Sequence, residues 1–213
     1  MLPEDWKTAS LGSCAQFVSG GTPSKESAEY WGGDFPWVTA RDMKSLRLFK
    51  SALTLTEKGR AVAAVAAVAP SNSILVLTRG MTLLKDLPVC LIQREMAFNQ
   101  DVKALIAMDG IDPLFLAYQI LINKPGILGL VDTAGHGTGR LDTDLLKQYE
   151  IRLAPLEEQQ RIVKAIRTWD DAEARSQRQL ELLKEEKKAL MIDLLAGKRR
   201  LRLPDPAPSV NAA

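Results

Sequence analysis

The feature that most constrains this chain is an uninterrupted stretch between Pro155 and Gly197 that contains neither glycine nor proline. Such a stretch predicts a single helix of about 40 residues, roughly 60 Å long at 1.5 Å per residue. Pro155 suits the first helical position, and Glu157 and Glu158 favour the positive end of the helix dipole. Gly197 and the basic residues 198–200 are typical of a helix C-terminus.

Side chains of this helix repeat at alternating steps of four and three residues, which is the heptad pattern of a coiled coil. The predicted dimer seam consists of Ile162, Ile166, Trp169, Glu173, Ser176, Leu180, Leu183, Lys187, Leu190 and Leu194. Its polar members would fix register or orientation at a cost in stability. A helix laid along its own domain is the alternative, but a domain of about 150 residues has a radius of gyration of only about 15 Å. We therefore expect part of the helix to pack on another helix.

The residues before the helix have a different pattern. Apolar and polar residues alternate over short stretches with frequent glycine and proline, which is typical of mixed strands and short helices. We expect a strand within 6–18, a glycine-rich turn at 19–23 and a turn into a short strand at 34–38. Further strands are expected at 74–77, 88–92, 102–106 and 149–153. Helices are expected after Thr56, behind Asp112-Pro113 as far as Ile122, and at 142–147.

The expected fold class is therefore α+β, with one mixed α/β globular domain followed by a long coiled-coil-forming α-helix. We place the globular domain at 1–152, the helical region at 153–200 and a disordered tail at 201–213. Hydrophobic residues make up 46% of the chain and charged residues 25%, so a buried core can form.

Composition also weighs against several classes of protein. The N-terminus lacks the basic start and apolar run of a signal peptide, and the longest apolar stretch, 61–69, is too short to span a bilayer. Cys14 and Cys90 lie far apart without metal-type spacing. We therefore expect a cytoplasmic protein with buried free thiols, no metal and no membrane association.

The charge distribution predicts only modest attraction to nucleic acid. Residues 1–150 hold 15 Lys/Arg and 16 Asp/Glu, a net charge of −1, whereas residues 151–213 hold 13 and 10, a net charge of +3. Neither part is strongly basic. If the chain binds DNA, counterion release from it alone would be small, and affinity would depend on partners.

No catalytic centre is indicated by the sequence. The single histidine, His136, has no nucleophile-elbow pattern or ligand cluster beside it. The segment 135–140 is similar to a phosphate-cradling loop, but no Lys-Ser/Thr follows it. An ordinary loop and a ligand-contacting loop remain equally compatible with it. We expect a non-enzymatic protein without a cofactor.

Six short segments occur in order along the chain: Ser-Gly-Gly-Thr-Pro-Ser at 19–24, Glu-Tyr-Trp-Gly-Gly-Asp-Phe-Pro-Trp-Val at 29–38, Leu-Thr-Arg-Gly at 77–80, Phe-Asn-Gln-Asp-Val-Lys-Ala-Leu at 98–105, Leu-Ala-Pro-Leu-Glu-Glu-Gln at 153–159 and Leu-Leu-Ala-Gly-Lys at 194–198. Together they resemble the specificity (S) subunit of type I restriction–modification systems. The resemblance implies a target recognition domain for half of a bipartite DNA site and a helical region that acts as spacer and dock. Members of the family usually have two of each, so this chain resembles a half-length form with a single target recognition domain.

Two segments depart from the family pattern. Residues 81–86 follow Thr78-Arg79-Gly80 where the family usually has a glycine-containing turn into a valine-rich strand. His136-Gly137-Thr138 stands where the family usually has Gly-Ser-Thr.

The motif residues themselves suggest scaffolding. Gly20, Gly21 and Pro23 are expected to form a tight turn, and Trp31, Pro36 and Trp37 an aromatic corner. DNA bases would be contacted from the variable stretches, through Arg or Lys to guanine and Asn or Gln to adenine. The candidate DNA-binding residues are Arg41, Lys44, Arg47, Arg79, Lys85, His136, Thr138 and Arg140. Each of them also fits an ordinary solvent-exposed role.

The sequence therefore predicts a DNA recognition subunit that forms a homodimer through its long helix. Its expected partners are double-stranded DNA, the methyltransferase (modification) subunits and, in some systems, the restriction/translocase subunit. The alternative is a coiled-coil adaptor whose globular head binds protein, and the series of motifs argues against it.

Overall fold

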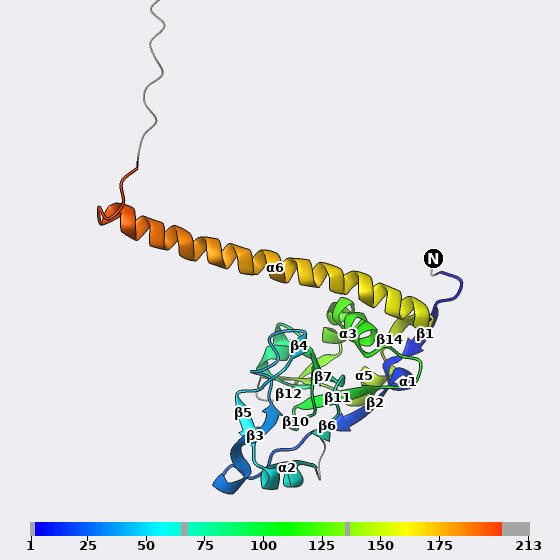
Figure 1. Ribbon diagram of the computed structural model, residues 1–213. Helices are drawn as coiled ribbons and strands as arrows, with labels where there is room; N and C mark the ends of the chain where they lie inside the picture. The colour runs from blue at the N-terminus through cyan, green and yellow to red at the C-terminus, as the bar shows by residue number, and fades with distance from the viewer. Residues whose placement is uncertain (1–2, 65–67, 135–136, 202–213) are drawn as a thin grey trace, which may run out of the picture. The chain divides into compact units, whose positions relative to one another are not determined.

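The computed structural model describes residues 3–64, 68–134 and 137–201, and it divides into two compact units, residues 1–163 and 164–213 (Figure 1). The expected fold class is confirmed, because a mixed α/β domain precedes one long helix. The larger part of the predicted tail, 202–213, lies outside the described residues. The two units are treated separately below.

The first unit is centred on a five-stranded sheet. β11 (Val102–Ala107) lies between its antiparallel neighbours β2 (Ala15–Ser19) and β7 (Ile74–Leu77), while β9 (Val89–Ile92) pairs with β7, and β4 (Arg47–Leu48) runs parallel to β9. All four residues of β7 and of β9 are buried. The apolar helix α3 (Pro113–Ile122) packs against β9 and β11, so the main core forms between this helix and the sheet.

Three smaller sheets flank the central one. The remaining strands are β5 (Leu53–Leu55), β3 (Trp31–Val38), β10 (Met96–Phe98) and β6 (Val68–Ala69) in the second sheet, β12 (Val131–Ala134), β13 (Thr138–Leu141) and β8 (Arg79–Gly80) in the third, and β1 (Lys7–Ser10) with β14 (Glu150–Leu153) in the fourth. The short helices are α1 (Leu11–Cys14), η1 (Ala28–Tyr30), α2 (Glu57–Ala64), η2 (Met81–Leu84), α4 (Lys124–Leu128) and α5 (Thr143–Gln148).

The helix starts that were predicted from capping residues are confirmed. The Asp112 carboxylate accepts hydrogen bonds from the Leu114 and Phe115 amides at the start of α3, both at 2.9 Å. Thr56 Oγ1 accepts from the Gly59 amide at 3.1 Å before α2. These side chains satisfy amides that have no partner within the helix.

Two predicted local features differ from the structure in detail. The strand expected within 6–18 is present, but α1 divides the segment into β1 and β2, and Ser10 Oγ caps that helical turn by accepting from the Ser13 amide at 3.3 Å. The turn expected at 19–23 is wrong, because Ser19 ends β2 and residues 20–23 form no turn. Gly20 is required there for another reason, since a Cβ at this position would lie 2.2 Å from the Phe98 carbonyl oxygen.

A third difference concerns β3. This strand begins at Trp31 rather than after a turn at Asp34, and its pairing with β5 shifts register between Trp31 and Phe35. The irregularity includes Gly32, whose φ of 87° lies in the region that favours glycine.

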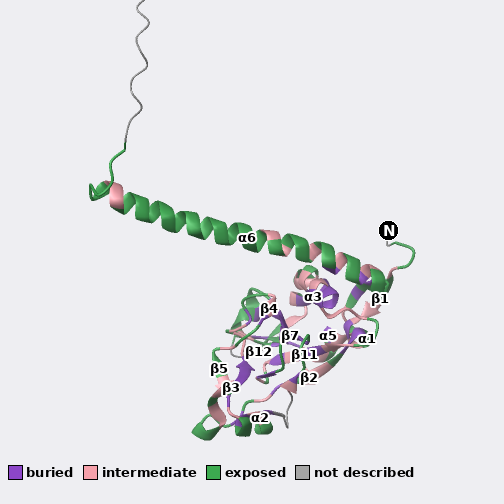
Figure 2. Cartoon of the chain, viewed as in Figure 1, coloured by how far each residue is buried: buried purple, intermediate pink, exposed green. Residues whose placement is uncertain are grey.

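The long helix is confirmed as α6 (Leu156–Leu195). Gly197 follows it with a φ of 71°, as expected for a helix C-cap. Within the first unit, the start of the helix buries Gln159 and Val163. From Lys164 to Leu195 no residue is buried, as the exposed and intermediate colours of this segment show (Figure 2).

The two cysteines are buried and unpaired, as expected. Burial raises the pKa of the Cys90 thiol to about 12. Among the residues described, no helix is long and apolar enough to cross a membrane.

Candidate nucleic-acid interface

Four of the six segments that carry the family resemblance meet at residues 98–101. The Phe98 carbonyl accepts a hydrogen bond from the Gly21 amide at 2.9 Å, and the Asn99 amide donates to the Val38 carbonyl at 3.0 Å. The Asp101 carbonyl accepts from the Thr78 amide at 2.8 Å. Three motif segments are thereby fixed to a fourth through their backbones. This arrangement agrees with a scaffolding role, since backbone contacts constrain shape rather than side-chain identity.

The expected aromatic corner forms on β3. The rings of Trp31 and Trp37 meet edge to face with centroids 5.0 Å apart, an arrangement that aromatic pairs favour. The Trp31 indole N–H donates to the Ser24 carbonyl at 3.0 Å, and that of Trp37 to the Gly21 carbonyl at 3.0 Å. Both indoles thus hold the segment 19–24 against β3.

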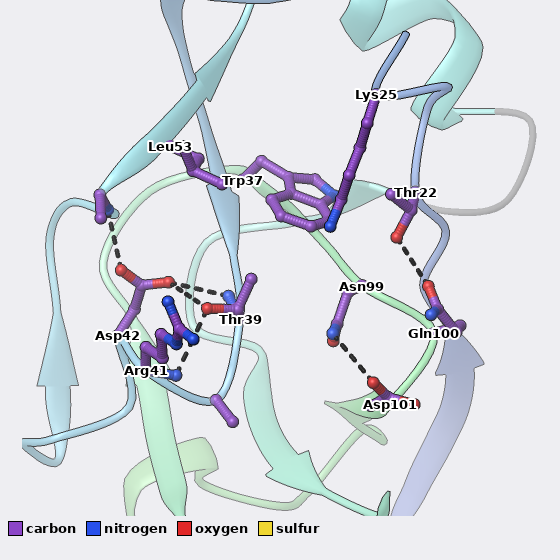
Figure 3. A pocket seen from close by; sticks show the side chains of 12 residues that line it. Thr22, Lys25, Trp37, Thr39, Arg41, Asp42, Leu53, Asn99, Gln100 and Asp101 are labelled. Atoms are coloured by element: carbon purple, nitrogen blue, oxygen red, sulfur yellow. Dashed lines mark hydrogen bonds between the residues drawn. The ribbon is translucent and has the colours of Figure 1, made fainter. Parts of the chain in front are cut away.

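A cavity of about 580 Å³ opens beside this corner, and we call it the Trp37 pocket (Figure 3). Trp37 and Leu53 supply an apolar wall, while Lys25 and Arg41 contribute positive charge. The pocket is lined by Thr22, Lys25, Trp37, Thr39, Ala40, Arg41, Asp42, Ala52, Leu53, Asn99, Gln100 and Asp101.

Asp42 shapes the loop that carries Arg41. Its carboxylate accepts from the Thr39 amide at 2.8 Å and the Thr39 hydroxyl at 3.0 Å, and its second oxygen accepts from the Ala52 amide at 2.8 Å (Figure 3). These hydrogen bonds fix the loop between Thr39 and Ala52 on which Arg41 lies.

A second cavity, of about 340 Å³, lies over the third sheet, and we call it the arginine pocket. It brings together Arg79 on β8 and Arg140 on β13, which are far apart in sequence. It is lined by Thr78, Arg79, Gln100, Lys103, Arg140, Leu141, Asp142, Thr143 and Asp144. Gln100 borders both pockets, so the two cavities adjoin along one surface of the domain.

The acidic residues of the arginine pocket are engaged locally. Asp142 caps α5 by accepting from the Asp144 amide at 2.8 Å and the Leu145 amide at 3.2 Å. These backbone hydrogen bonds lower the pKa of Asp142, and the nearby Arg140 contributes in the same direction. Asp144 pairs with Lys147 at 2.9 Å.

The predicted site residues are distributed unevenly over the domain. Arg41 lies at the Trp37 pocket, and Arg79 and Arg140 line the arginine pocket. The other predicted residues line neither cavity: Lys44 is exposed in the loop after Arg41, Lys85 is exposed at the end of η2, Thr138 is half-buried on β13, Arg47 is half-buried on β4, and His136 lies outside the described residues. The Arg47 Nη2 atom is buried without a hydrogen-bond partner among the described residues.

The pocket residues that were not selected from the sequence include four with side chains able to bind DNA: Thr22, Lys25, Gln100 and Lys103. Thr22 donates its hydroxyl hydrogen to Gln100 Oε1 at 2.6 Å, which leaves the Gln100 amide nitrogen able to donate. Three of the four lie inside the motifs at 19–24 and 98–105, so the motif pattern itself could have indicated them.

The chemistry that these two pockets can support is binding through cations, hydroxyls and amides. Within the described ranges, no three or more His, Cys, Asp or Glu side chains gather as a metal site. The cations, hydroxyls and amides of the two pockets suit phosphate oxygens and the acceptor edges of bases.

Comparison of the sequence with known families gives one clear result. A family model described as the type I restriction modification DNA specificity domain matches residues 3–185. The EcoR124I/EcoR124II specificity subunit of Escherichia coli is 32% identical over 167 residues, which cover 78% of this chain and 41% of that protein. The MjaIX specificity subunit of Methanocaldococcus jannaschii is 28% identical over 186 residues, covering 85% and 42%. The chain thus spans about two fifths of the length of these relatives.

Solved structures show the same fold. The HsdS subunit from Thermoanaerobacter tengcongensis superposes with a TM-score of 0.61 at 20% identity, over 84% of this chain and 40% of that one. A chain from a study of complex assembly and conformational transition of the type I R-M system gives a TM-score of 0.67 at 20% identity, over 89% and 44%.

Proposed function

We propose, from the premise that this chain belongs to the type I restriction–modification DNA specificity family, that it recognises a double-stranded DNA sequence for a partner methyltransferase. The observation that carries this proposal is the surface around Gln100, where the two pockets adjoin. Basic side chains from separate segments gather there, although the domain as a whole is close to neutral.

The role divides between fixed and variable parts of the domain. The motif backbones hold each other through 98–101, whereas the side chain of Arg79 extends from one of these motifs and those of Arg41 and Arg140 extend from segments between motifs. In this arrangement, backbone contacts maintain the surface and side chains contact the DNA.

We further propose that α6 pairs with α6 of a second copy. The segment 164–195 has no buried side chain, and Leu180, Leu183 and Leu190 on the predicted seam are exposed by 45%, 53% and 41%. Most helices in proteins depend on packing of an apolar face, so a partner helix would supply what this segment lacks. A second copy is the occupant we favour, because the chain spans two fifths of relatives in which the resemblance implies two recognition domains. An antiparallel pairing follows from the same resemblance.

Catalysis would then come from the methyltransferase subunits, and the restriction/translocase subunit would join in systems that have one. At the candidate interface the Thr39 hydroxyl donates to the Asp42 carboxylate, but that carboxylate also accepts from the Thr39 and Ala52 amides and stabilises the loop.

Methylation mapping tests the proposal. The chain is co-expressed with its methyltransferase, and modified sites are mapped in the host DNA with and without the chain. We expect methylation at one defined sequence that depends on the chain. Methylation that is unchanged when the chain is absent would contradict the proposal, and binding of a protein but no DNA would favour the coiled-coil adaptor.

A further inference from the structure

Arg79 and Arg140 are direct cross-strand neighbours, because the antiparallel register of β8 and β13 places one opposite the other. Directly opposed residues point to the same face with Cβ atoms about 5 Å apart, and like charges in this position destabilise a strand pair. Neither guanidinium has a hydrogen bond or ion pair with another described residue. The two positive charges therefore face the arginine pocket together without a bound counter-charge.

The backbone holds this pair of charges in place. The Leu141 amide donates to the Thr78 carbonyl at 2.8 Å, and the Thr78 hydroxyl donates to the Asp101 carbonyl at 3.0 Å. Gly139 allows η2 and β8 to lie close to β13, since a Cβ there would lie 2.8 Å from the Leu83 side chain and 3.2 Å from the Gly80 carbonyl oxygen. The repulsion is thus maintained by the fold, as expected of a site that an anion completes.

The other charged groups of the pocket leave it positive. Lys103, whose ammonium donates to Ser19 Oγ, adds a third cation. Of the two acidic residues, Asp144 is paired with Lys147, and Asp142 is occupied by the amides of α5, although it remains near Arg140.

The lining distinguishes a phosphate from a base. Leu141 is the only large apolar residue among those that line the arginine pocket, and no aromatic side chain is among them. Bases that bind in protein pockets generally stack on aromatic or apolar surfaces, whereas phosphate oxygens favour guanidinium groups and hydroxyls such as that of Thr143. The Trp37 pocket, with its aromatic wall, has the opposite character.

We propose that Arg79 and Arg140 jointly bind a single backbone phosphate of the DNA, so that they contribute affinity and register but no sequence preference. The inference rests on the proposed function, because the phosphate belongs to the DNA that the chain recognises. It assigns to two of the candidate residues a positioning role distinct from base contact.

Salt-dependent binding tests this assignment. Binding of the full chain to fluorescent duplexes of unrelated sequence, one A·T-rich and one G·C-rich, is measured by anisotropy at several salt concentrations. The variants are Arg79→Gln, Arg140→Gln and the double variant, with Arg152→Gln on the exposed face of β14 as the matched loss of one charge. Thermal melting establishes that each variant is folded.

One shared phosphate predicts a specific result. The slope of log K against log salt should fall by about 0.9 in the double variant, which is the value for one phosphate, and not by about 1.8. Both duplexes should lose affinity equally, and Arg152→Gln should leave the slope unchanged. A fall of about 1.8 would overturn the shared phosphate. A loss confined to the G·C-rich duplex would show guanine contact instead, and an unchanged slope in the double variant would remove both arginines from the interface.

Inorganic phosphate separates failure of this assignment from failure of the proposed function. Titration of phosphate should shift the arginine side-chain NMR signals that the Arg79→Gln and Arg140→Gln variants lose. If the parent chain bound no duplex but these signals shifted, the phosphate site would stand and DNA recognition would fail. If the chain bound duplex and the signals did not move, the phosphate site would be rejected.

Discussion

Gln159 is a single residue on which the start of α6 depends. Its side chain is 1% exposed, accepts a hydrogen bond from the Asp112 amide at 2.8 Å and donates to the Ala154 carbonyl at 2.8 Å and the Gly110 carbonyl at 3.2 Å. A Gln159→Leu substitution would leave the buried Ala154 carbonyl and the partly buried Asp112 amide without partners, at about 1–3 kcal/mol for each group that water cannot reach, whereas Gly110 lies in an exposed position. We expect the free energy of unfolding, measured with urea, to fall by about 2 kcal/mol or more.

Gln160 provides the matched control, since it is the same residue type one position later and is exposed. Gln160→Leu should change the free energy of unfolding by no more than about 0.5 kcal/mol. Equal effects of the two substitutions would show that the three hydrogen bonds of Gln159 contribute little.

The Cys90 thiol should make stability depend on alkaline pH. Burial raises its pKa from 9.0 to about 12, so between these values the folded thiol keeps a proton that the unfolded thiol has lost. The folded state then binds more protons than the unfolded state, and stability falls as pH rises through this interval. We expect Cys90→Ala to lose stability less steeply than the parent chain between pH 9 and pH 12 in urea unfolding.

Val89→Ala, at a buried neighbour without a titratable group, controls for the cavity. The Val89→Ala variant should have a lower free energy of unfolding at every pH, and its stability should still fall steeply as the pH rises. If the free energies of unfolding of the parent chain and of Cys90→Ala ran parallel as the pH rises, the Cys90 thiol would have the same pKa in the folded and unfolded states.

At the scale of elements, the sequence predicted those with strong local signals. The glycine- and proline-free run identified α6, Asp112 and Pro113 marked the start of α3, and continuous apolar runs located β7 and β9. Helices and strands that are too short to show a hydrophobic periodicity gave no such signal. The four-residue α1 and the two-residue β8 are examples, and β8 forms only because β13, distant in sequence, pairs with it.

The same limit applied to the candidate interface. Arg79 and Arg140 were selected as separate loop residues, but their opposition across two strands depends on non-local pairing that no periodicity reveals. Gln100 and Lys103 were read as part of a motif and not as surface residues. The linings of the two cavities show that this motif also borders both pockets.

Pairing of α6 can be tested by placing charges on the seam. Leu183→Asp with Leu190→Asp should yield monomers in light scattering at micromolar concentration, because burial of each leucine is worth about 1.5–3 kcal/mol and a buried aspartate is unfavourable. Leu182 and Ile192 lie off the seam and are exposed by 53% and 54%, so Leu182→Asp with Ile192→Asp is a control of similar exposure. A parent chain that is already monomeric, or equal effects of the two pairs, would contradict the predicted seam.

At the scale of the whole molecule, the proposed symmetric dimer would constrain the DNA target. A two-fold pair presents two identical recognition domains, each facing the same bases on opposite strands. We expect methylation mapping, with this chain as the sole specificity subunit, to find an interrupted palindrome. An asymmetric target would argue against the symmetric pair.

The length of α6 should determine the gap between the two halves of the target. Deleting the heptad 181–187 preserves the register of the seam and shortens the helix by about 10 Å, which corresponds to roughly three base pairs of B-DNA. We expect the mapped gap to shrink while the recognised halves stay the same. A gap of unchanged length in the deletion variant would show that the helix does not set the spacing.

The pairing of β1 with β14 has a consequence for exchange between genes. These strands are the first and last of the globular domain, and their register joins Lys7 to Leu153 and Ser10 to Glu150. The chain between β1 and β14 therefore begins and ends at the same edge of the globular domain. A segment from another chain could therefore replace this interior by two crossovers, provided that it ends in the same strand pair, and the recipient would acquire a new specificity while its helix and its partners stayed unchanged.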